Sequence, residues 1–203
     1  MNMHKTLIFA AVVLGTSGFS SCSMNKPGGG ILSYHAYDRP AKLPQDPAAV
    51  TVKVSLSKQR AYLMEGREML MVMPVSIGAP ETPTPVGDFR ITDKERKRRE
   101  GGSANGSPLP YWCGFKPGLG FHTGWLKHHP CTNGCIRMHE NLAPKFYRLV
   151  SIGTPVNISY AQPQDAQWAH MKLPPDAGPL PDYDSAMYLG DGYFHRHKEP
   201  EFE

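Results

Sequence analysis

Apolar and polar residues alternate along the chain from residue 50 onwards. The apolar members of this first alternation are Val50, Val52, Val54 and Leu56. A period of two predicts a strand with one buried face. Residues 61–64 and 68–77 predict two further strands, joined as a hairpin around Glu65-Gly66-Arg67. Within the second of these, residues 69–73 are apolar on both faces, which is typical of a central strand.

The pattern continues with short elements separated by turns. Pro83 and Pro85 exclude regular structure over residues 82–87, because proline lacks the N–H that a strand ladder needs. Strands are predicted over residues 88–93, 111–116, 119–124 and 154–160, and a helix over residues 141–150 with Pro144 in its first turn. Residues 94–107 are predicted to be a solvated polar loop, with contact to a polyanion as the alternative. The whole predicts a mainly β fold with one or two short helices.

The N-terminus follows a different pattern. Residues 1–5 carry one Lys and no acid, residues 6–14 are apolar, and small residues follow. This layout is typical of a secretory signal peptide, and the apolar stretch is shorter than the roughly 20 residues that span a bilayer. Phe19-Ser20-Ser21-Cys22 resembles a bacterial lipobox, with an ordinary cleavage site as the alternative. We expect residues 1–21 to be a signal peptide and Cys22 to be lipidated.

Composition and charge divide the remainder of the chain. Residues 22–49, which contain Gly28-Gly29-Gly30, are predicted to be a lipid anchor and tether, and residues 50–160 to be the folded domain. Residues 22–160 carry a net charge of +8, whereas residues 161–203 carry −5 and six prolines. We interpret residues 161–203 as a Pro-rich acidic C-terminal extension, extended or partly disordered. Its apolar residues, including Trp168 and Phe194, would let it dock.

Composition also excludes several classes of protein. The 203 residues include 20 Gly and 20 Pro, which disfavours a helical bundle and fits short strands with many turns. The hydrophobic fraction of 40% is enough for a folded core. A net charge of +4 is too weak and dispersed to indicate nucleic-acid binding. A polytopic membrane protein, a collagen, a coiled coil and a disulfide-dense miniprotein are all excluded.

Residues that carry chemistry gather between positions 122 and 139. They are His122, His128, His129, Cys131, Cys135 and His139. A zinc site could use Cys131 and Cys135 with His128 or His129, but the spacing fits loosely and an exported cysteine pair competes with oxidation. We therefore expect no metal. We expect His128, His129 and His139 to be surface residues.

A thiol nucleophile with an imidazole base suits the same residues better. Cys135 would be the nucleophile, and His122, at the end of a predicted strand, would be the base and would lower the pKa of the thiol. Gly134 would allow a tight turn, so that backbone N–H groups converge on an oxyanion. Three states of the other cysteines stay open: a Cys113–Cys131 disulfide, a Cys131–Cys135 disulfide, or free thiols.

Five separated motifs occur in an order that resembles one family. They are TPVGDF at 84–89, LPYW at 109–112, GFHTG at 120–124, TNGCIRM at 132–138 and GTPV at 153–156. Together with residues 56–60 they resemble the catalytic domain of bacterial L,D-transpeptidases, the cysteine enzymes that cross-link peptidoglycan. The resemblance covers about residues 50–160, and the His122-to-Cys135 spacing matches the short-loop branch. It implies a β-sandwich-like fold.

The resemblance implies a cysteine acyl transferase acting on peptidoglycan stem peptides. Cys135 would form a thioester with the third residue of a donor stem and release D-Ala, with His122 as base. Arg137 would orient the loop or contact the donor, and the N–H groups of Gly134 and Cys135 would build the oxyanion hole. The residues expected to contact substrate are Thr132, Asn133, Trp112 and Tyr111, although Tyr111 and Trp112 also fit a core position. No metal or organic cofactor is implied.

Position 133 departs from the family. The usual residue before the Gly-Cys pair is His, and this chain has Asn133. Because the resemblance makes His122 the base, activity is expected to survive. The alternatives are an L,D-carboxypeptidase and a non-catalytic peptidoglycan-binding lipoprotein. In each case the protein is expected in the cell envelope, anchored to a membrane and facing the periplasm or cell wall.

Overall fold

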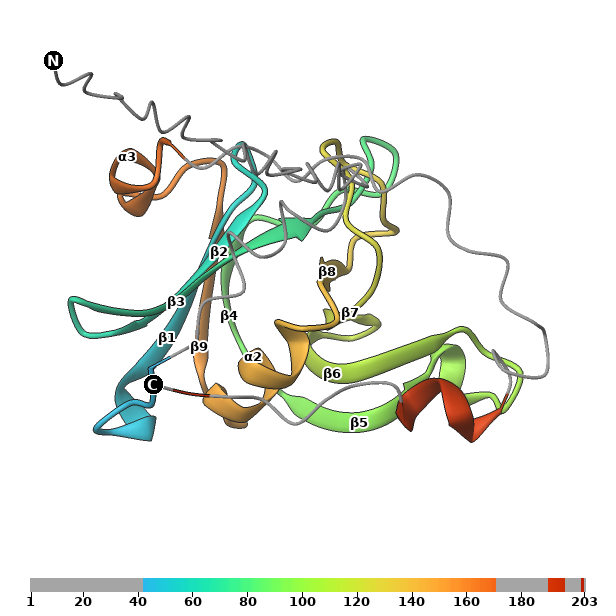
Figure 1. Ribbon diagram of the computed structural model, residues 1–203. Helices are drawn as coiled ribbons and strands as arrows, with labels where there is room; N and C mark the ends of the chain where they lie inside the picture. Colours follow the sequence, from blue (N-terminus) through green and yellow to red (C-terminus); the bar gives the residue numbers. More distant parts are fainter. Residues whose placement is uncertain (1–41, 171–189, 196–201, 203) are drawn as a thin grey trace, which may run out of the picture.

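The computed structural model describes residues 42–170, 190–195 and 202 (Figure 1). Within these residues nine strands form one sheet in the order β4-β9-β1-β2-β3-β8-β7-β6-β5. The strands are β1 (Val50–Ser55), β2 (Arg60–Glu65), β3 (Glu68–Ser76), β4 (Gly87–Arg90), β5 (Asp93–Arg99), β6 (Pro108–Lys116), β7 (Leu119–Thr123), β8 (Ile136–Met138) and β9 (Pro155–Ser159). The helices are α2 (Ala143–Leu149), α3 (Gln164–Gln167) and the 3-10 helices η1 (Pro47–Ala49), η2 (Glu100–Gly102) and η3 (Asp191–His195). The expected signal peptide, Cys22 and most of the expected tether lie outside the described residues.

The strands follow the predicted pattern of burial. Along β1 every second residue, from Val50 to Val54, is fully buried. β2 and β3 form the predicted antiparallel hairpin, and Gly66 in its turn has φ 58°, a conformation that favours glycine. β3 pairs with β2 through most of its length and with β8 at its end. The hairpin and the central position of β3 are therefore confirmed.

The sheet curls so that its two halves face each other across the core (Figure 1). The chain between β4 and β5 links the halves, because the Ile91 N–H donates to Thr154 O and the Thr92 N–H donates to Gly114 O. Phe89 of β4 lies 5.4 Å from Phe115 of β6, measured between ring centroids. The mainly β, sandwich-like fold with few short helices is confirmed.

The predicted polar loop over residues 94–107 is wrong in its first half. Residues 93–99 form β5, an edge strand that, within the part of the chain that the structure describes, pairs only with β6. Its charged side chains give no apolar alternation, which is typical of edge strands that must avoid further pairing. They pack instead over aromatic rings: the Lys94 ammonium lies 4.3 Å from the ring centroid of Tyr147. The strand predicted over residues 88–93 is too long at its C-terminal end. β4 ends at Arg90, and Asp93 already belongs to β5.

Two described parts of the C-terminal extension pack on the sheet. Asp165 of α3 accepts hydrogen bonds from Tyr62 Oη at 2.6 Å, Ser55 Oγ at 2.7 Å and the Gln162 N–H at 2.9 Å. In η3, Phe194 is 5% exposed and the guanidinium of Arg99 lies 5.1 Å from its ring centroid.

Among the described residues, no helix is long and apolar enough to cross a bilayer.

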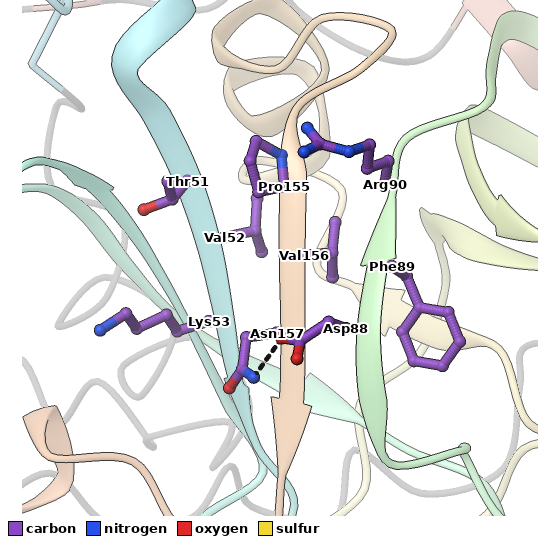
Figure 2. Close-up of a pocket in the computed structure, with 9 residues that line it drawn as sticks. All are labelled: Thr51, Val52, Lys53, Asp88, Phe89, Arg90, Pro155, Val156 and Asn157. Carbon is purple, nitrogen blue, oxygen red and sulfur yellow. Dashed lines mark hydrogen bonds between the residues drawn. The ribbon is translucent and has the colours of Figure 1, made fainter.

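A hollow of about 520 Å³ lies over β1, β9 and β4 (Figure 2). Asn157 Nδ2 donates to Asp88 Oδ1 at 2.6 Å across it, and Figure 2 shows the two side chains pointing toward each other. The lining residues are Thr51, Val52, Lys53, Asp88, Phe89, Arg90, Pro155, Val156 and Asn157. None of these is a residue that the sequence predicts for the site, so the hollow is separate from that chemistry.

Candidate active site

Cys135 and His122 are brought together by two parallel strands. Phe121 of β7 pairs with Ile136 of β8, and His122 pairs with Arg137. Because side chains alternate along a strand, Phe121 and Ile136 enter the core while His122 and Arg137 lie on the opposite face. Cys135 directly precedes β8 and shares the face of Arg137, two residues on. The thiol and the imidazole therefore occupy one face of adjacent strands.

The loop that presents Cys135 is held by the end of β3. The N–H groups of Cys131 and Thr132 donate to Ile77 O at 2.8 and 3.0 Å. The buried Thr132 hydroxyl donates to Cys135 O at 2.6 Å and accepts from the Gly134 N–H at 3.2 Å. Gly134 has φ 101°, which only glycine adopts easily. Thr132 thus shapes the loop, and the Gly134 N–H is engaged inside it.

His122 is buried and oriented by backbone. Its side chain is 6% exposed, and Nδ1 lies 2.8 Å from Thr123 O. A carbonyl oxygen can only accept, so Nδ1 carries a proton and Nε2 of the neutral ring has a free lone pair. Burial lowers the pKa of His122 to about 4, with a smaller effect in the same direction from Arg137 and an opposing one from Thr123. His122 is therefore a neutral base around pH 7.

The Cys135 thiol is half-buried, with Sγ 3.8 Å from Gly118 O. Burial raises the pKa of Cys135, while a backbone hydrogen bond at Gly120 and the charge of Arg137 act in the opposite direction. The sequence predicts a lowered thiol pKa, and this direction is wrong because desolvation outweighs the favourable charges. Thiol and imidazole are both neutral at rest, so the proton must move as the thiol attacks.

Arg137 supplies a positive charge that lowers the pKa of both groups. Its aliphatic stem lies against Gly124, where an added Cβ would come within 2.8 Å of Arg137 Cδ. Its Nη1 lies 4.0 Å from Cys131 Sγ. Cys113, Cys131 and Cys135 are free thiols, and Cys113 is fully buried in the core. Over the described ranges, no three His, Cys, Asp or Glu side chains gather as metal ligands.

The two aromatic residues expected to contact substrate, Trp112 and Tyr111, differ in their neighbours. Trp112 is buried and stacks on His122, with ring centroids 6.3 Å apart and planes 23° apart. Tyr111 is also buried but points away, edge-on to Tyr147 at 5.6 Å. Both therefore occupy the core position that the sequence allows, and only Trp112 contacts the site.

The remaining polar residues near the site lie at the surface or in the turn before α2. His128 and His129 are exposed, as expected, and their rings contact each other at 4.9 Å. His139 is half-buried instead, because its Nδ1 accepts from the Asn141 N–H at 3.2 Å ahead of α2. Asn133 is exposed. Of the residues expected to contact substrate, only Asn133 presents its side chain to solvent.

Sequence reasoning missed two supports of the site. The Thr84 hydroxyl accepts from the Gly78 N–H at 2.9 Å and donates to Gly134 O at 3.0 Å, which ties the proline-rich loop to the Cys135 loop. Thr84 begins the TPVGDF motif at 84–89, but nothing in the neighbouring sequence indicates that it bonds to the Cys135 loop. Thr123 acts through its backbone oxygen, so its side-chain type gives no signal at all.

The fold and the site define a mainly β protein that presents a cysteine thiol beside a buried histidine on two parallel strands. The model of the YkuD family, described as the L,D-transpeptidase catalytic domain, matches residues 49–158. The chain therefore belongs to the YkuD family of L,D-transpeptidase catalytic domains.

Individual relatives agree with the family. The chain is 34% identical over 101 residues to probable L,D-transpeptidase 3 of Mycobacterium tuberculosis, covering 42% of this chain and 37% of that protein. It is 26% identical over 120 residues to L,D-transpeptidase 1 of the same species, covering 51% and 48%. A crystal structure of an L,D-transpeptidase from Stackebrandtia nassauensis aligns with TM-score 0.51 and 24% identity over 61% of this chain and 60% of that one, a likeness of fold. The chain spans less than half the length of the two curated relatives.

Proposed function

We propose that the protein is an L,D-transpeptidase, a cysteine acyl transferase acting on peptidoglycan stem peptides. The observation that carries the proposal is the neutral His122 on the same strand face as Cys135, with Nδ1 held by Thr123 O and Nε2 left to accept a proton. Membership of the YkuD family supports the reaction class. The two named relatives are both L,D-transpeptidases.

The first half-reaction forms a thioester. Cys135 Sγ attacks the carbonyl carbon that links the third residue of a donor stem to its terminal D-Ala. His122 Nε2 takes the thiol proton as the S–C bond forms, and it delivers that proton to the departing amine of D-Ala as the C–N bond breaks. Because both groups are neutral at rest, proton transfer accompanies attack.

The second half-reaction resolves the thioester. A side-chain amine of another stem attacks the same carbonyl carbon, His122 takes the proton of that amine, and the thiolate of Cys135 leaves and is reprotonated. The product is a cross-link. Attack by a lysine of a protein would give an attached protein, and attack by water would give a trimmed tripeptide, the L,D-carboxypeptidase outcome.

Loop residues support both steps. The Cys135 N–H is expected to hold the oxyanion, joined by the Gly134 N–H once its 3.2 Å bond to Thr132 opens. Arg137 lies close enough to lower the pKa of Cys135 and to stabilise the negative charge that develops during attack. Asn133 is exposed on the same loop and is placed to contact the donor stem.

The direct test is incubation of the purified protein with muropeptides, followed by mass spectrometry. Wild type should release D-Ala and accumulate a Cys135 acyl adduct, and Cys135→Ala should show neither. His122→Ala should lower the acylation rate nearly as far, since no base would then take the thiol proton as the thiol attacks. Binding of muropeptides by wild type with no adduct and no product would replace the enzyme with a non-catalytic peptidoglycan-binding protein.

We further propose that the protein is an exported lipoprotein of the cell envelope. Residues 1–21 would be removed, Cys22 lipidated, residues 22–49 would act as tether, 50–160 as catalytic domain and 161–203 as extension. Several acyl chains on one residue give stable anchoring, whereas one chain gives marginal binding. Detergent-phase partitioning of wild type and Cys22→Ser tests the anchor. Equal partitioning of the two would refute it.

A further inference from the structure

Trp112 is fixed in place by the neighbouring strand β5. Its Nε1 donates to Asp93 Oδ2 at 2.6 Å. The guanidinium carbon of Arg98 lies 4.6 Å from the centroid of its ring, within the range of a cation–π contact. Arg98 also pairs with Asp93 and with Glu95, each at 3.4 Å. The indole is thus held at its edge and over its face by residues of one strand.

The same indole packs on the two strand positions that carry the site. Its ring is stacked on His122, with centroids 6.3 Å apart. It also lies against Gly120, where an added Cβ would come within 2.8 Å of Cη2 and Cζ2 of the indole. Gly120 precedes Phe121, the partner of Ile136 in β8, and its backbone acts to lower the pKa of the Cys135 thiol. The indole therefore contacts the base and the backbone that supports the nucleophile.

We infer that Trp112, anchored by Asp93 and Arg98, is a positioning residue that fixes the plane of the His122 ring and keeps water from it. This rests on the proposed function, because it assigns Trp112 to the base of that reaction. Thr123 O fixes the tautomer of His122, and Trp112 fixes the ring against rotation. The substrate need not touch Trp112, which is 2% exposed.

The electrostatic surroundings of His122 decide what the loss of Trp112 should do. On the β8 side Arg137 pairs with His122 and lowers its pKa, with Cys135 on the same strand face, and on the β5 side Asp93 and Arg98 contact the indole. Removing the indole would admit water to the imidazole and reduce its desolvation. The pKa of His122 should then rise from about 4 toward its ordinary value of 6.5.

The experiment compares Trp112→Leu and Trp112→Phe with Phe115→Leu as matched control. Phe115 is a buried aromatic residue of the same strand that packs on Phe89 and Phe121, away from His122. Two readouts are taken from each protein: the pKa of His122 by NMR titration, and the rate of Cys135 acylation against pH. The first does not depend on activity.

Trp112→Leu should raise the pKa of His122 and lower the acylation rate about tenfold at the optimum, with the acid limb moved to higher pH. Trp112→Phe should shift both in the same direction and by less, so it carries the test if Trp112→Leu does not fold. Phe115→Leu should lose stability with an unchanged pH profile. An unchanged His122 pKa and profile in both Trp112 variants would overturn the inference. A wild type that forms no Cys135 adduct would instead overturn the proposed function.

Discussion

At the scale of single residues, burial of His122 makes the stability of the fold depend on pH. The folded-state pKa of about 4 lies below the unfolded value of 6.5, so the unfolded chain binds more protons between these limits. Stability contributed by the neutral ring is therefore present above pH 6.5 and lost as pH falls toward 4. We expect this residue alone to account for a loss of about 3 kcal/mol in the free energy of unfolding.

Urea unfolding of wild type and His122→Gln at pH 7 and pH 4.5 measures how much His122 contributes to the pH dependence of the free energy of unfolding. The difference between the two pH values should be markedly smaller in His122→Gln, because Gln does not titrate. Equal acid sensitivity of the two proteins would show that the imidazole is already solvated in the folded state.

The exposed Asn133 predicts a second effect at this scale. Replacing it by His would place an imidazole with an ordinary pKa near 6.5 beside the loop of Cys135. Acylation should gain or shift a limb near that pH, while the rate at the optimum changes by no more than about tenfold. Acylation rates against pH for both proteins decide the matter. Superimposable profiles would mean that position 133 has no electrostatic contact with the site.

At the scale of elements, the proline-rich loop before β4 supports the loop of Cys135. Thr84→Val would remove the hydroxyl that links Gly78 to Gly134 and leave two buried backbone groups without this partner. We expect a loss of about 1–3 kcal/mol in the free energy of unfolding and about a tenfold slower acylation. The measurements are urea unfolding and single-turnover acylation.

Thr82→Val is the matched control for this prediction. Its hydroxyl also donates to the loop, to Thr132 O at 2.9 Å, but Thr82 is exposed and water can replace it. It should cost less than about 1 kcal/mol. If both valine variants lose the same stability and the same activity, Thr84 has no special part in holding the loop.

At the scale of the whole molecule, the 3-10 helix η3 packs against the edge strand β5. Phe194 of η3 is buried under Arg99 of β5, and Arg99 Nη2 donates to Gly190 O at 3.3 Å. Phe194→Ala should lower the free energy of unfolding by about 1.5–3 kcal/mol, the usual gain from burying such a side chain. Hydrogen exchange of the β5 amides should become faster.

Ile152→Ala controls for the loss of a large apolar side chain, because Ile152 is 68% exposed. It should change stability by no more than about 0.5 kcal/mol. Unchanged stability and unchanged β5 exchange in Phe194→Ala would show that η3 is not needed to hold this edge strand.

Much of the molecule follows from local sequence. Alternation around Val52 and the apolar run around Met71 determine their strands, since burial of one or both faces leaves a period in the chain. The motifs around His122 and Cys135 also predict the site from local sequence, because its chemistry depends on residue type. Local sequence does not predict β5, because an edge strand of charged residues has no buried face and so shows no alternation.

Only the tertiary structure decided how the site works. The sequence by itself determined that Cys135, His122 and Trp112 are present, and it left Trp112 open between core and substrate. The pairing of β6, β7 and β8 places the indole against the imidazole, and burial then raises one pKa and lowers the other. Desolvation is a property of everything packed around a group, and those atoms come from strands far apart in the chain. No local sequence pattern can therefore predict how desolvation shifts these pKa values.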